Sequence, residues 1–422
     1  MKVSRFETII YHLHFSNNEI QPEKDSPHFD RLYKFRAMIN NFSRSFTESA
    51  RMETHMAVDE MLAPAKGMVP GRVYMPNKPH KRGFKLWAAA GSKSGYVHRF
   101  QLAGDDTLEH ENVHHSIGNS GRVVLELVSQ CPPGSNIYFD NYFASPLLAK
   151  VLLDRGYYST MTLKGNRKSG ADKCLQTEKV LKRTGRGTFD YVQSNDVLVC
   201  HWFDSKLVSV ASTSYGIYPV DNVGRWTKTK TNKKATGRTI TMEKTEINRP
   251  YLIKMYNRGM GGVDLADQYI ANYRLDMKTE KWYKKMFYFF VDLSAANAFQ
   301  CFKVDSQDKM EYLNFKMSIA LSLMRNHTGG LTTDTNYLTM DPPSETYQFV
   351  PDEVRLTKVG EHFAKWMQGS LQGIRTGHGR HCHLRGCKSK VRSYCVVCRV
   401  YLCYQNKDCF IKWHTLSRKR VQ

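Results

Sequence analysis

The sequence lacks the apolar segments that membrane proteins and secreted proteins need. No run reaches the roughly eighteen apolar residues of a membrane-spanning helix. The first residues, Met1–Glu7, contain no apolar stretch of the kind found in a signal peptide. These absences predict an intracellular protein with no membrane partner.

Acidic residues are scarce relative to basic ones. The 422 residues include 39 Asp and Glu against 62 Lys and Arg, which gives a formal net charge of +23. Such an excess favours a polyanionic partner, most often nucleic acid. The alternatives are a basic protein without such a partner and one that binds an acidic membrane surface. The length predicts two or three domains.

The cysteines are too unevenly distributed for a disulfide framework. Four of the ten are scattered, and the other six lie between Cys382 and Cys409. This distribution is typical of a chain that stays reduced, in the cytosol or nucleus, and carries one metal-binding module.

Local patterns predict an α/β protein with a modular order. Apolar periodicity predicts a helical segment over residues 1–50, and short β-type runs begin after it. Segments rich in Lys, Arg, Thr and Gly suggest a β-rich insertion before helical periodicity resumes. The predicted division is a helical segment 1–50, a first catalytic-core segment 51–164, a β-rich insertion 165–250, a second catalytic-core segment 251–325, a linker 326–376 and a cysteine-rich module 377–422.

Four carboxylates follow the predicted elements in a suggestive order. Asp59 and Asp140 each end a short β-type run, and Asp264 and Asp267 lie three apart at the start of a predicted helix. Oxygen ligands of this kind bind Mg²⁺, and paired Mg²⁺ ions support phosphoryl transfer. We therefore predict a ribonuclease-H-like nuclease core. The alternative is that these residues are ordinary turn residues and helix caps.

Several spaced motifs make a resemblance specific. They are Val58–Leu62, Tyr74–Pro79 followed by Gly83–Leu86, Phe139–Ser145, Tyr256–Asn257 and Gly261–Gln268. In this order they resemble the piggyBac-type transposases, which cut and paste DNA at TTAA sites. The resemblance implies a catalytic triad of Asp59, Asp140 and Asp264, with Asp267 as an auxiliary acid and two Mg²⁺ ions.

The resemblance also implies partners and a location. It suggests double-stranded DNA as substrate, namely transposon ends and TTAA target, as well as a homodimer and a nuclear location. Members of the family usually carry a longer N-terminal portion, so residues 1–50 are interpreted as a remnant of a dimerisation or DNA-binding region. The alternative function is a domesticated descendant that binds DNA or chromatin without moving it.

Two basic groups are candidate DNA contacts. The first lies beside Asp59 and comprises Asn77, Lys78, Lys81, Arg82 and Lys85. The second interleaves charge with an aromatic ring and comprises Arg274, Lys278, Lys281, Trp282, Lys284 and Lys285. Charge can hold phosphate while a ring stacks on an exposed base. The alternatives are a solvated loop for the first group and a core role for Trp282.

The C-terminal segment has the residue types and density of a zinc module. Zinc prefers four thiolate or imidazole ligands in a tetrahedron, so this segment can form two sites, plausibly interleaved. The predicted ligands are Cys382, His383, Cys387, Cys395, Cys398, Cys403, Cys409 and His414. Either Cys382 or His383 can supply the first of them. Arg418–Arg420 beyond the module is either a weak nuclear-import signal or a charged terminus.

Overall fold

The structure is a computed structural model in two compact units, Met1–Tyr312 and Leu313–Gln422. The described residues are 3–66, 69, 71–76, 78–105, 117–165, 170–194, 196–233, 237–275, 277–306, 309–327, 350, 352–357, 362, 364–366, 380–395, 397–404 and 407–415.

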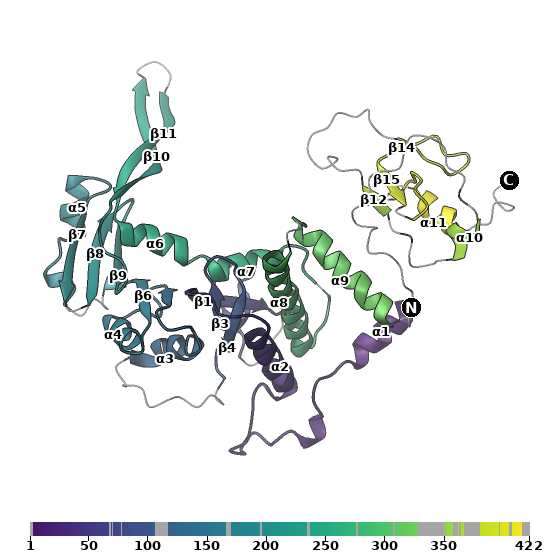
Figure 1. The fold of residues 1–422 in the computed structure, drawn as a ribbon, viewed down its shortest axis with the longest axis horizontal. Helices are drawn as coiled ribbons and strands as arrows, with labels where there is room; N and C mark the ends of the chain where they lie inside the picture. Colours follow the sequence, from purple (N-terminus) through teal and green to yellow (C-terminus); the bar gives the residue numbers. More distant parts are fainter. Residues whose placement is uncertain are drawn as a thin grey trace. The chain divides into compact units, whose positions relative to one another are not determined.

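The first unit is built on one mixed sheet (Figure 1), in the order β2-β3-β1-β5-β6-β9-β8-β7, with β4 also paired to β3. Its described strands are β1 (His55–Pro64), β2 (Val73–Tyr74), β3 (Arg82–Gly91), β4 (Val97–Leu102), β5 (Asn136–Phe139), β6 (Tyr158–Thr162), β7 (Phe189–Ser194), β8 (Val197–Phe203) and β9 (Leu207–Ser212). The strands β1, β5 and β6 run parallel, whereas β3 is antiparallel to β1.

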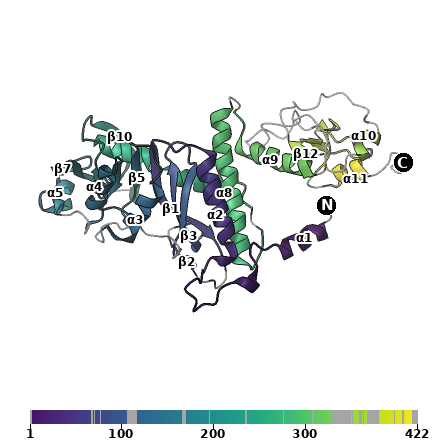
Figure 2. The same ribbon diagram turned by 60° about the horizontal axis from the view of Figure 1, so that its bottom comes forward.

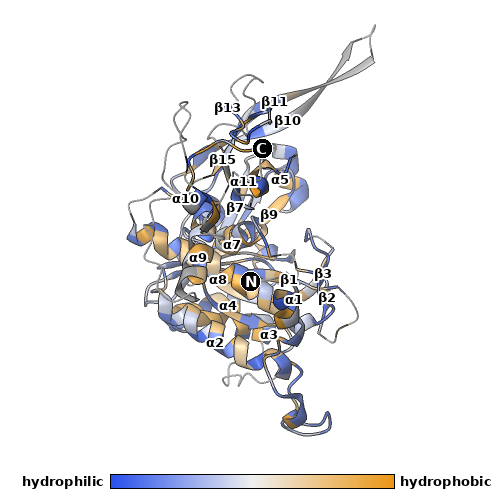
Figure 3. Ribbon diagram, turned by 90° about the vertical axis from the view of Figure 1, so that its right-hand side faces the viewer, coloured by the Kyte–Doolittle hydropathy of each residue, from blue (hydrophilic) through white to orange (hydrophobic). Residues whose placement is uncertain are grey.

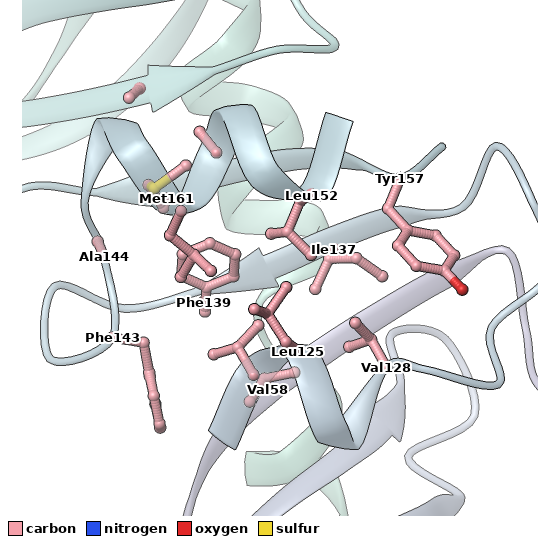
Figure 4. Close-up of a cluster of buried hydrophobic side chains, with 14 of the residues drawn as sticks. Val58, Leu125, Val128, Ile137, Phe139, Phe143, Ala144, Leu152, Tyr157 and Met161 are labelled. Carbon is pink, nitrogen blue, oxygen red and sulfur yellow. The ribbon is translucent and has the colours of Figure 1, made fainter. Parts of the chain in front are cut away.

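One face of the sheet is covered by the helices α3 (Gly118–Leu127) and α4 (Pro146–Asp154). Figure 4 shows part of this core, in which Val58 of β1 and Phe139 of β5 lie among apolar side chains from both helices. α4 begins cleanly because Ser145 caps it: its hydroxyl oxygen accepts a hydrogen bond from the Leu148 amide, with Pro146 in the first turn. This core holds the ends of β1 and β5 in place.

The opposite face is covered by α2 (Tyr33–Ser49), α7 (Gly262–Ala271) and α8 (Trp282–Asp305). Ala57 and Met61 of β1 point into this second core, so alternate residues of one strand serve both faces. Figure 2 shows α2 and α8 side by side, and the Phe42 and Phe290 rings stack at 5.0 Å between them. In Figure 3, α2 carries both orange and blue positions, as an amphipathic covering helix should.

The segment predicted as an insertion extends the same sheet. β9 pairs with β6, and β8 and β7 continue outward from it. The segment also contains η4 (Ala171–Lys173), α5 (Glu178–Thr184) and a long hairpin, β10 (Asp221–Lys233) with β11 (Gly237–Arg249), which projects from the sheet in Figure 1. α6 (Tyr251–Gly259) then returns the chain to the sheet, where Leu252 and Ile253 are buried.

The N-terminal residues form α1 (Val3–His12) and η1 (Asn18–Ile20) ahead of α2. α9 (Tyr312–His327) follows α8 along the chain. None of the described helices is long and apolar enough to cross a membrane.

The second unit contains small elements around a cysteine-rich core. They are α10 (Asp352–Thr357), β12 (Ala364–Trp366), β13 (Arg380–His381), β14 (Lys390–Val391), β15 (Ser393–Cys395) and α11 (Cys409–Thr415). The predicted linker, 326–376, lies mostly outside the described residues, but α10 and β12 fall within it. β12 pairs with β15, so this stretch of the predicted linker belongs to the cysteine-rich fold and is not a structureless connection.

Candidate functional site

Two of the predicted acids lie where the pairing of two neighbouring parallel strands stops. The β1–β5 ladder ends with Val58 beside Phe139; Asp59 is the next residue of β1, which continues to Pro64, and Asp140 follows the last residue of β5. The Asp59 carboxylate accepts a hydrogen bond of 2.8 Å from the Glu60 amide, and the Asp140 carboxylate accepts one of 2.9 Å from the Tyr142 amide. Parallel pairing therefore brings together two acids that are 81 positions apart in the sequence.

A glycine brings the third acid close to the strand ends. A Cβ on Gly262, the first residue of α7, would lie 2.6 Å from the Gly91 carbonyl oxygen and 3.2 Å from the Ala57 side chain. Only glycine permits so close an approach of helix to sheet. Asp264 stands in the first turn of this helix, exposed to solvent, and Asp267 follows one turn later.

The carboxylates lie near enough to perturb one another. Burial raises the pKa of Asp59 to about 7, and the negative charges of Asp140 and Asp264 contribute to the rise. Burial also raises the pKa of Asp140, with Glu60 adding to the effect. The pKa of Tyr256 rises to about 12, mainly through burial and further through all three aspartates. These side chains therefore face one region.

Asp267 belongs to the same region. Burial raises its pKa to about 6, the Lys78 charge opposes this, and Asp264 adds to it. The Lys78 ammonium donates hydrogen bonds to the Glu60 carbonyl oxygen at 2.8 Å and to the Asp267 carboxylate at 3.4 Å. One cation thus partly compensates a group of like charges.

The donor set fits hard divalent cations. Carboxylate oxygens are the ligands that Mg²⁺ prefers, and partly buried like charges with raised pKa values gain from a cation between them. Among the described residues, Asp59, Asp140 and Asp264 do not form a group with all ligand atoms within 4.8 Å of one another.

The first basic group is divided by the structure. Lys78 and Lys85 lie at the acidic region, where the Lys85 ammonium donates to the Glu60 carboxylate at 2.6 Å and lies 4.3 Å from the Tyr142 ring centre. Lys81 and Arg82 are exposed, and Arg82 stands over the Tyr74 ring. Asn77 lies outside the described residues. The exposed pair remains available to phosphate.

The second basic group is corrected at Lys284, which is buried. Its ammonium donates to the carbonyl oxygens of Ile10 and Tyr11, at the end of α1, so it terminates a helix instead of facing solvent. Desolvation lowers its pKa. The physical reason is local: the turn of α8 that carries Lys284 faces the end of α1, where two carbonyl oxygens accept from the ammonium.

Trp282 is half-buried, and its ring packs 5.3 Å from the Phe84 ring centre. This placement favours the alternative that Trp282 opens the apolar helix as a member of the core. Its neighbours are more accessible: Lys278 and Lys281 are exposed, Arg274 is partly exposed, and Lys285 donates to the Met277 carbonyl oxygen at 2.5 Å. A basic surface therefore remains around a packed ring.

The second unit contains two metal-sized groups. One comprises His362, Cys395, Cys398 and His414, and the other comprises Cys382, Cys387, Cys403 and Cys409, each with its ligand atoms within 4.8 Å of one another. Representative distances are 3.3 Å from His362 Nδ1 to Cys395 Sγ and 3.7 Å from Cys387 Sγ to Cys403 Sγ. Metal–ligand bonds of about 2.0–2.3 Å in a tetrahedron give ligand separations of this size.

His383 is not a member of either group, which corrects the predicted ligand set. Its backbone amide donates to the Tyr401 carbonyl oxygen at 2.8 Å, and burial lowers the pKa of its imidazole. His362 takes the fourth place, from within the predicted linker, and its ring lies 4.3 Å from that of His414. No cysteine stands near His362 in the sequence. The missing fourth ligand of the Cys395–Cys398–His414 set is the only signal that points to it.

The two groups alternate along the chain. Residues of the second group, Cys382 and Cys387, come between His362 and Cys395, and Cys403 and Cys409 come between Cys398 and His414. The interleaving predicted from the sequence is therefore present. Each group closes loops that contain ligands of the other, so filling either group restrains most of the unit.

Comparisons with known proteins agree with this architecture. The family model described as Transposase IS4 matches residues 1–299. The chain is 30% identical to human piggyBac transposable element-derived protein 3 over 334 residues, which covers 78% of this chain and 52% of that protein. It is 29% identical to human piggyBac transposable element-derived protein 2 over 324 residues, which covers 75% of this chain and 51% of that protein.

The fold also matches a solved structure, the cryo-EM structure of a piggyBac transposase synaptic complex with hairpin DNA. The TM-score is 0.59 at 22% identity, and the match covers 80% of this chain and 66% of that one. The chain therefore belongs to the transposase family of the matching model, and the curated relatives that it resembles are piggyBac transposable element-derived proteins. It spans about half the length of the curated relatives it matches.

Proposed function

We propose that the chain is a DNA transposase of the three-aspartate type, with Asp59, Asp140 and Asp264 as the metal-binding acids and Asp267 as an auxiliary acid. The observation that carries this proposal is the convergence of Asp59 from within β1, Asp140 from the end of β5 and Asp264 from the first turn of α7. The arrangement of β4, β3, β1, β5 and β6, three antiparallel strands and then two parallel ones, supports a ribonuclease-H-like core.

Two Mg²⁺ ions bound by these acids would activate the attacking hydroxyl and stabilise the leaving oxygen. The protein's own contribution is positional. The β1–β5 ladder and the Gly262 contact hold the acids on rigid elements, and Lys78 holds Asp267. Asp264 is exposed, so DNA phosphate can approach the acids from its side.

The proposed reaction sequence is that of cut-and-paste transposition. Water attacks at the transposon end, the freed 3′-hydroxyl attacks the opposite strand, and it later attacks TTAA target DNA. The net charge of +23 supports double-stranded DNA as substrate. A nuclear location and a homodimer complete this proposal. The candidate import signal Arg418–Arg420 lies outside the described residues.

Two Zn²⁺ ions are proposed for the second unit. One would be bound by His362, Cys395, Cys398 and His414, and the other by Cys382, Cys387, Cys403 and Cys409. Thiolate and imidazole ligands in closed sets of four suit structural zinc better than any hard cation. Burial of Cys395, Cys398, Cys403 and Cys409 is consistent with ligands that have no open coordination position.

Cleavage of a labelled transposon-end duplex tests the catalytic assignment. Wild-type protein should cut it in Mg²⁺, and Asp140→Asn should not. Asp154→Asn, an exposed acid at the end of α4, is the matched control and should cut normally. Equal, non-zero cutting by wild type and Asp140→Asn would remove the assignment.

A domesticated DNA-binding protein is the second candidate. The observation in its favour is that the curated human relatives are described as transposable element-derived proteins. Duplex binding without cleavage by the wild type, on authentic flanking ends and with Mg²⁺ present, would support this second function over the first.

A further inference from the structure

The β10–β11 ribbon (residues 221–249) is an arm with a firmly held base. Val223 and Ile247 pack into a core with strands of the main sheet, and the Trp202 indole donates to the Asn248 carbonyl oxygen at 2.8 Å. Gly187 approaches the same place, since a Cβ there would lie 2.8 Å from the Asn248 amide nitrogen. The base is therefore fixed, while Figure 1 shows the ribbon projecting past β7–β9.

One face of the ribbon is directed at the protein. Side chains alternate between faces along a strand, so odd-numbered residues share one face. Besides Val223 and Ile247, this face contains Arg225, which donates to Asp204 at 2.9 Å, and Thr227, which accepts a hydrogen bond from Arg186 at 3.1 Å. The odd face thus meets the protein's own core and loops near the base.

The even face carries exposed apolar and basic groups. Trp226 is 63% exposed and Met242 is 50% exposed, although such side chains are usually covered. Lys244 is paired directly opposite Trp226, and its aliphatic chain lies over Gly224, where a Cβ would come within 2.4 Å of Lys244 Cε. We call the Trp226, Met242 and Lys244 surface the Trp226 face.

The ribbon is strongly basic beyond its base. Residues 221–249 contain eight basic and three acidic residues. Two of the acids, Asp221 and Glu246, lie toward the base, and Asp221 is paired with Arg249 at 2.8 Å. The strands stay paired beyond Trp226, with Lys230 opposite Ile240 and Asn232 opposite Arg238. A long, narrow, basic element with an exposed ring complements a polyanion.

We propose that the Trp226 face of the ribbon is a binding surface for double-stranded DNA. Each strand has 13 residues, so the ribbon reaches ~40 Å. The major groove of B-DNA, about 12 Å wide, admits a two-stranded β-ribbon. Lys244 contacts phosphate, and the Trp226 ring supplies apolar contact to sugar or base edges. This inference rests on the proposed function, in which double-stranded DNA is the substrate. It adds a second DNA surface, distant in sequence from the four acids.

The test is duplex binding by the full chain, measured by fluorescence anisotropy on a labelled duplex of about thirty base pairs at several salt concentrations. The variants are Trp226→Ala, Lys244→Gln and the two combined. Tyr191→Ala, which removes an exposed ring of β7, and Lys179→Gln, which removes an exposed charge of α5, are the matched controls.

The double variant should bind about tenfold more weakly than wild type, and the controls should bind normally. Lys244→Gln alone should lower the slope of log K against log salt by about 0.9, whereas Trp226→Ala should weaken binding without changing that slope. Circular dichroism checks that the variants are folded.

Equal binding by wild type and the double variant overturns this inference and leaves the proposed function intact. Failure of the wild type itself to bind duplex overturns both. If Trp226→Ala changes the oligomeric state in light scattering but not duplex binding, the face is a protein contact and the inference is wrong.

Discussion

The acidic region of the first unit and the cysteine groups of the second bring candidate metal ligands together in different ways. Asp59, Asp140 and Asp264 come from β1, the end of β5 and α7, do not all lie within 4.8 Å of one another, and include an exposed member. The cysteine groups are tighter, and all of their cysteines except Cys387 are buried. Open coordination suits catalysis, whereas closed coordination suits structure.

The difference extends to folding. The sheet that holds the aspartates is covered on both faces by apolar cores, so it has a stable fold without metal. The second unit has a small core made largely of the ligands themselves, with Val400 and Leu402 among the few buried aliphatics. The second unit should therefore need metal to fold, whereas the first unit should need metal only for its chemistry.

The largest expected effect separates the two metal roles. Cys398→Ser breaks the His362 group and should abolish protease resistance of residues 380–415, because structural zinc contributes about 10 kcal/mol or more to such folds. Asp140→Asn should leave the proteolysis pattern unchanged. Limited proteolysis with mass spectrometry measures both. If residues 380–415 of the Cys398→Ser chain resisted protease in zinc-free buffer, the proposed difference between the metal roles of the two units would be wrong.

A pair of histidines sharpens the ligand assignment. His362→Ala should lower the zinc content from two ions to about one per chain, because it removes a member of a closed set of four. His383→Ala is the control and should keep two. Elemental analysis of purified full-length protein measures the ratio. Loss of one zinc ion in His383→Ala but not in His362→Ala would show that His383, and not His362, is the zinc ligand.

The acids should also give the metal-free first unit an unusual pH dependence. The pKa values of Asp59 and Asp267 are raised to about 7 and about 6. A folded-state pKa above the unfolded value means that the stabilising contribution is present below about pH 4 and is lost as pH rises through 6–7.

Accordingly, metal-free protein should be less stable at pH 8 than at pH 5, by up to about 3 kcal/mol from Asp59. Mg²⁺ should reduce the difference, since a bound cation stabilises the charged form. Urea denaturation followed by tryptophan fluorescence measures it, and Asp59→Asn should flatten the profile. If Asp59→Asn left the pH dependence of stability unchanged, Asp59 would not be the source of that dependence.

A smaller effect tests how α7 is positioned. Gly262→Ala should cost about 1–3 kcal/mol and displace Asp264, because its Cβ would collide with the Gly91 carbonyl. Gly261→Ala is the matched control, since its Cβ would meet nothing within 4 Å. Thermal unfolding and cleavage assays measure the pair. Equal behaviour of the two variants would argue against close packing of α7.

What could be predicted from the sequence follows from how local each signal is. Asp140 ends a short apolar run, and its place after β5 can be inferred from neighbouring residues. Asp59 also ends such a run, but β1 continues past it to Pro64, so the end of that strand could not be inferred in this way. His362 cannot be found in this way, because its partners are more than thirty positions away and nothing beside it marks a ligand. The burial of Lys284 against α1 could not be predicted either, because sequence alone does not show which lysine of an apolar helix points inward.

The insertion shows the same limit on a larger scale. Its β character is visible in alternating residues, but pairing of β9 with β6, which makes it an extension of the main sheet, depends on contacts between Thr160 and Ser212. Such long-range pairing leaves no mark in either strand alone.

The central claim is that Asp59, Asp140 and Asp264 bind shared divalent cations. Its most direct test is calorimetric titration of the zinc-loaded, DNA-free chain with Mn²⁺, compared across wild type, Asp59→Asn, Asp140→Asn and Asp154→Asn. If the acids bind shared cations, Asp59→Asn and Asp140→Asn lose Mn²⁺ binding, whereas Asp154→Asn binds it like wild type. Undiminished Mn²⁺ binding by both Asp59→Asn and Asp140→Asn would contradict it.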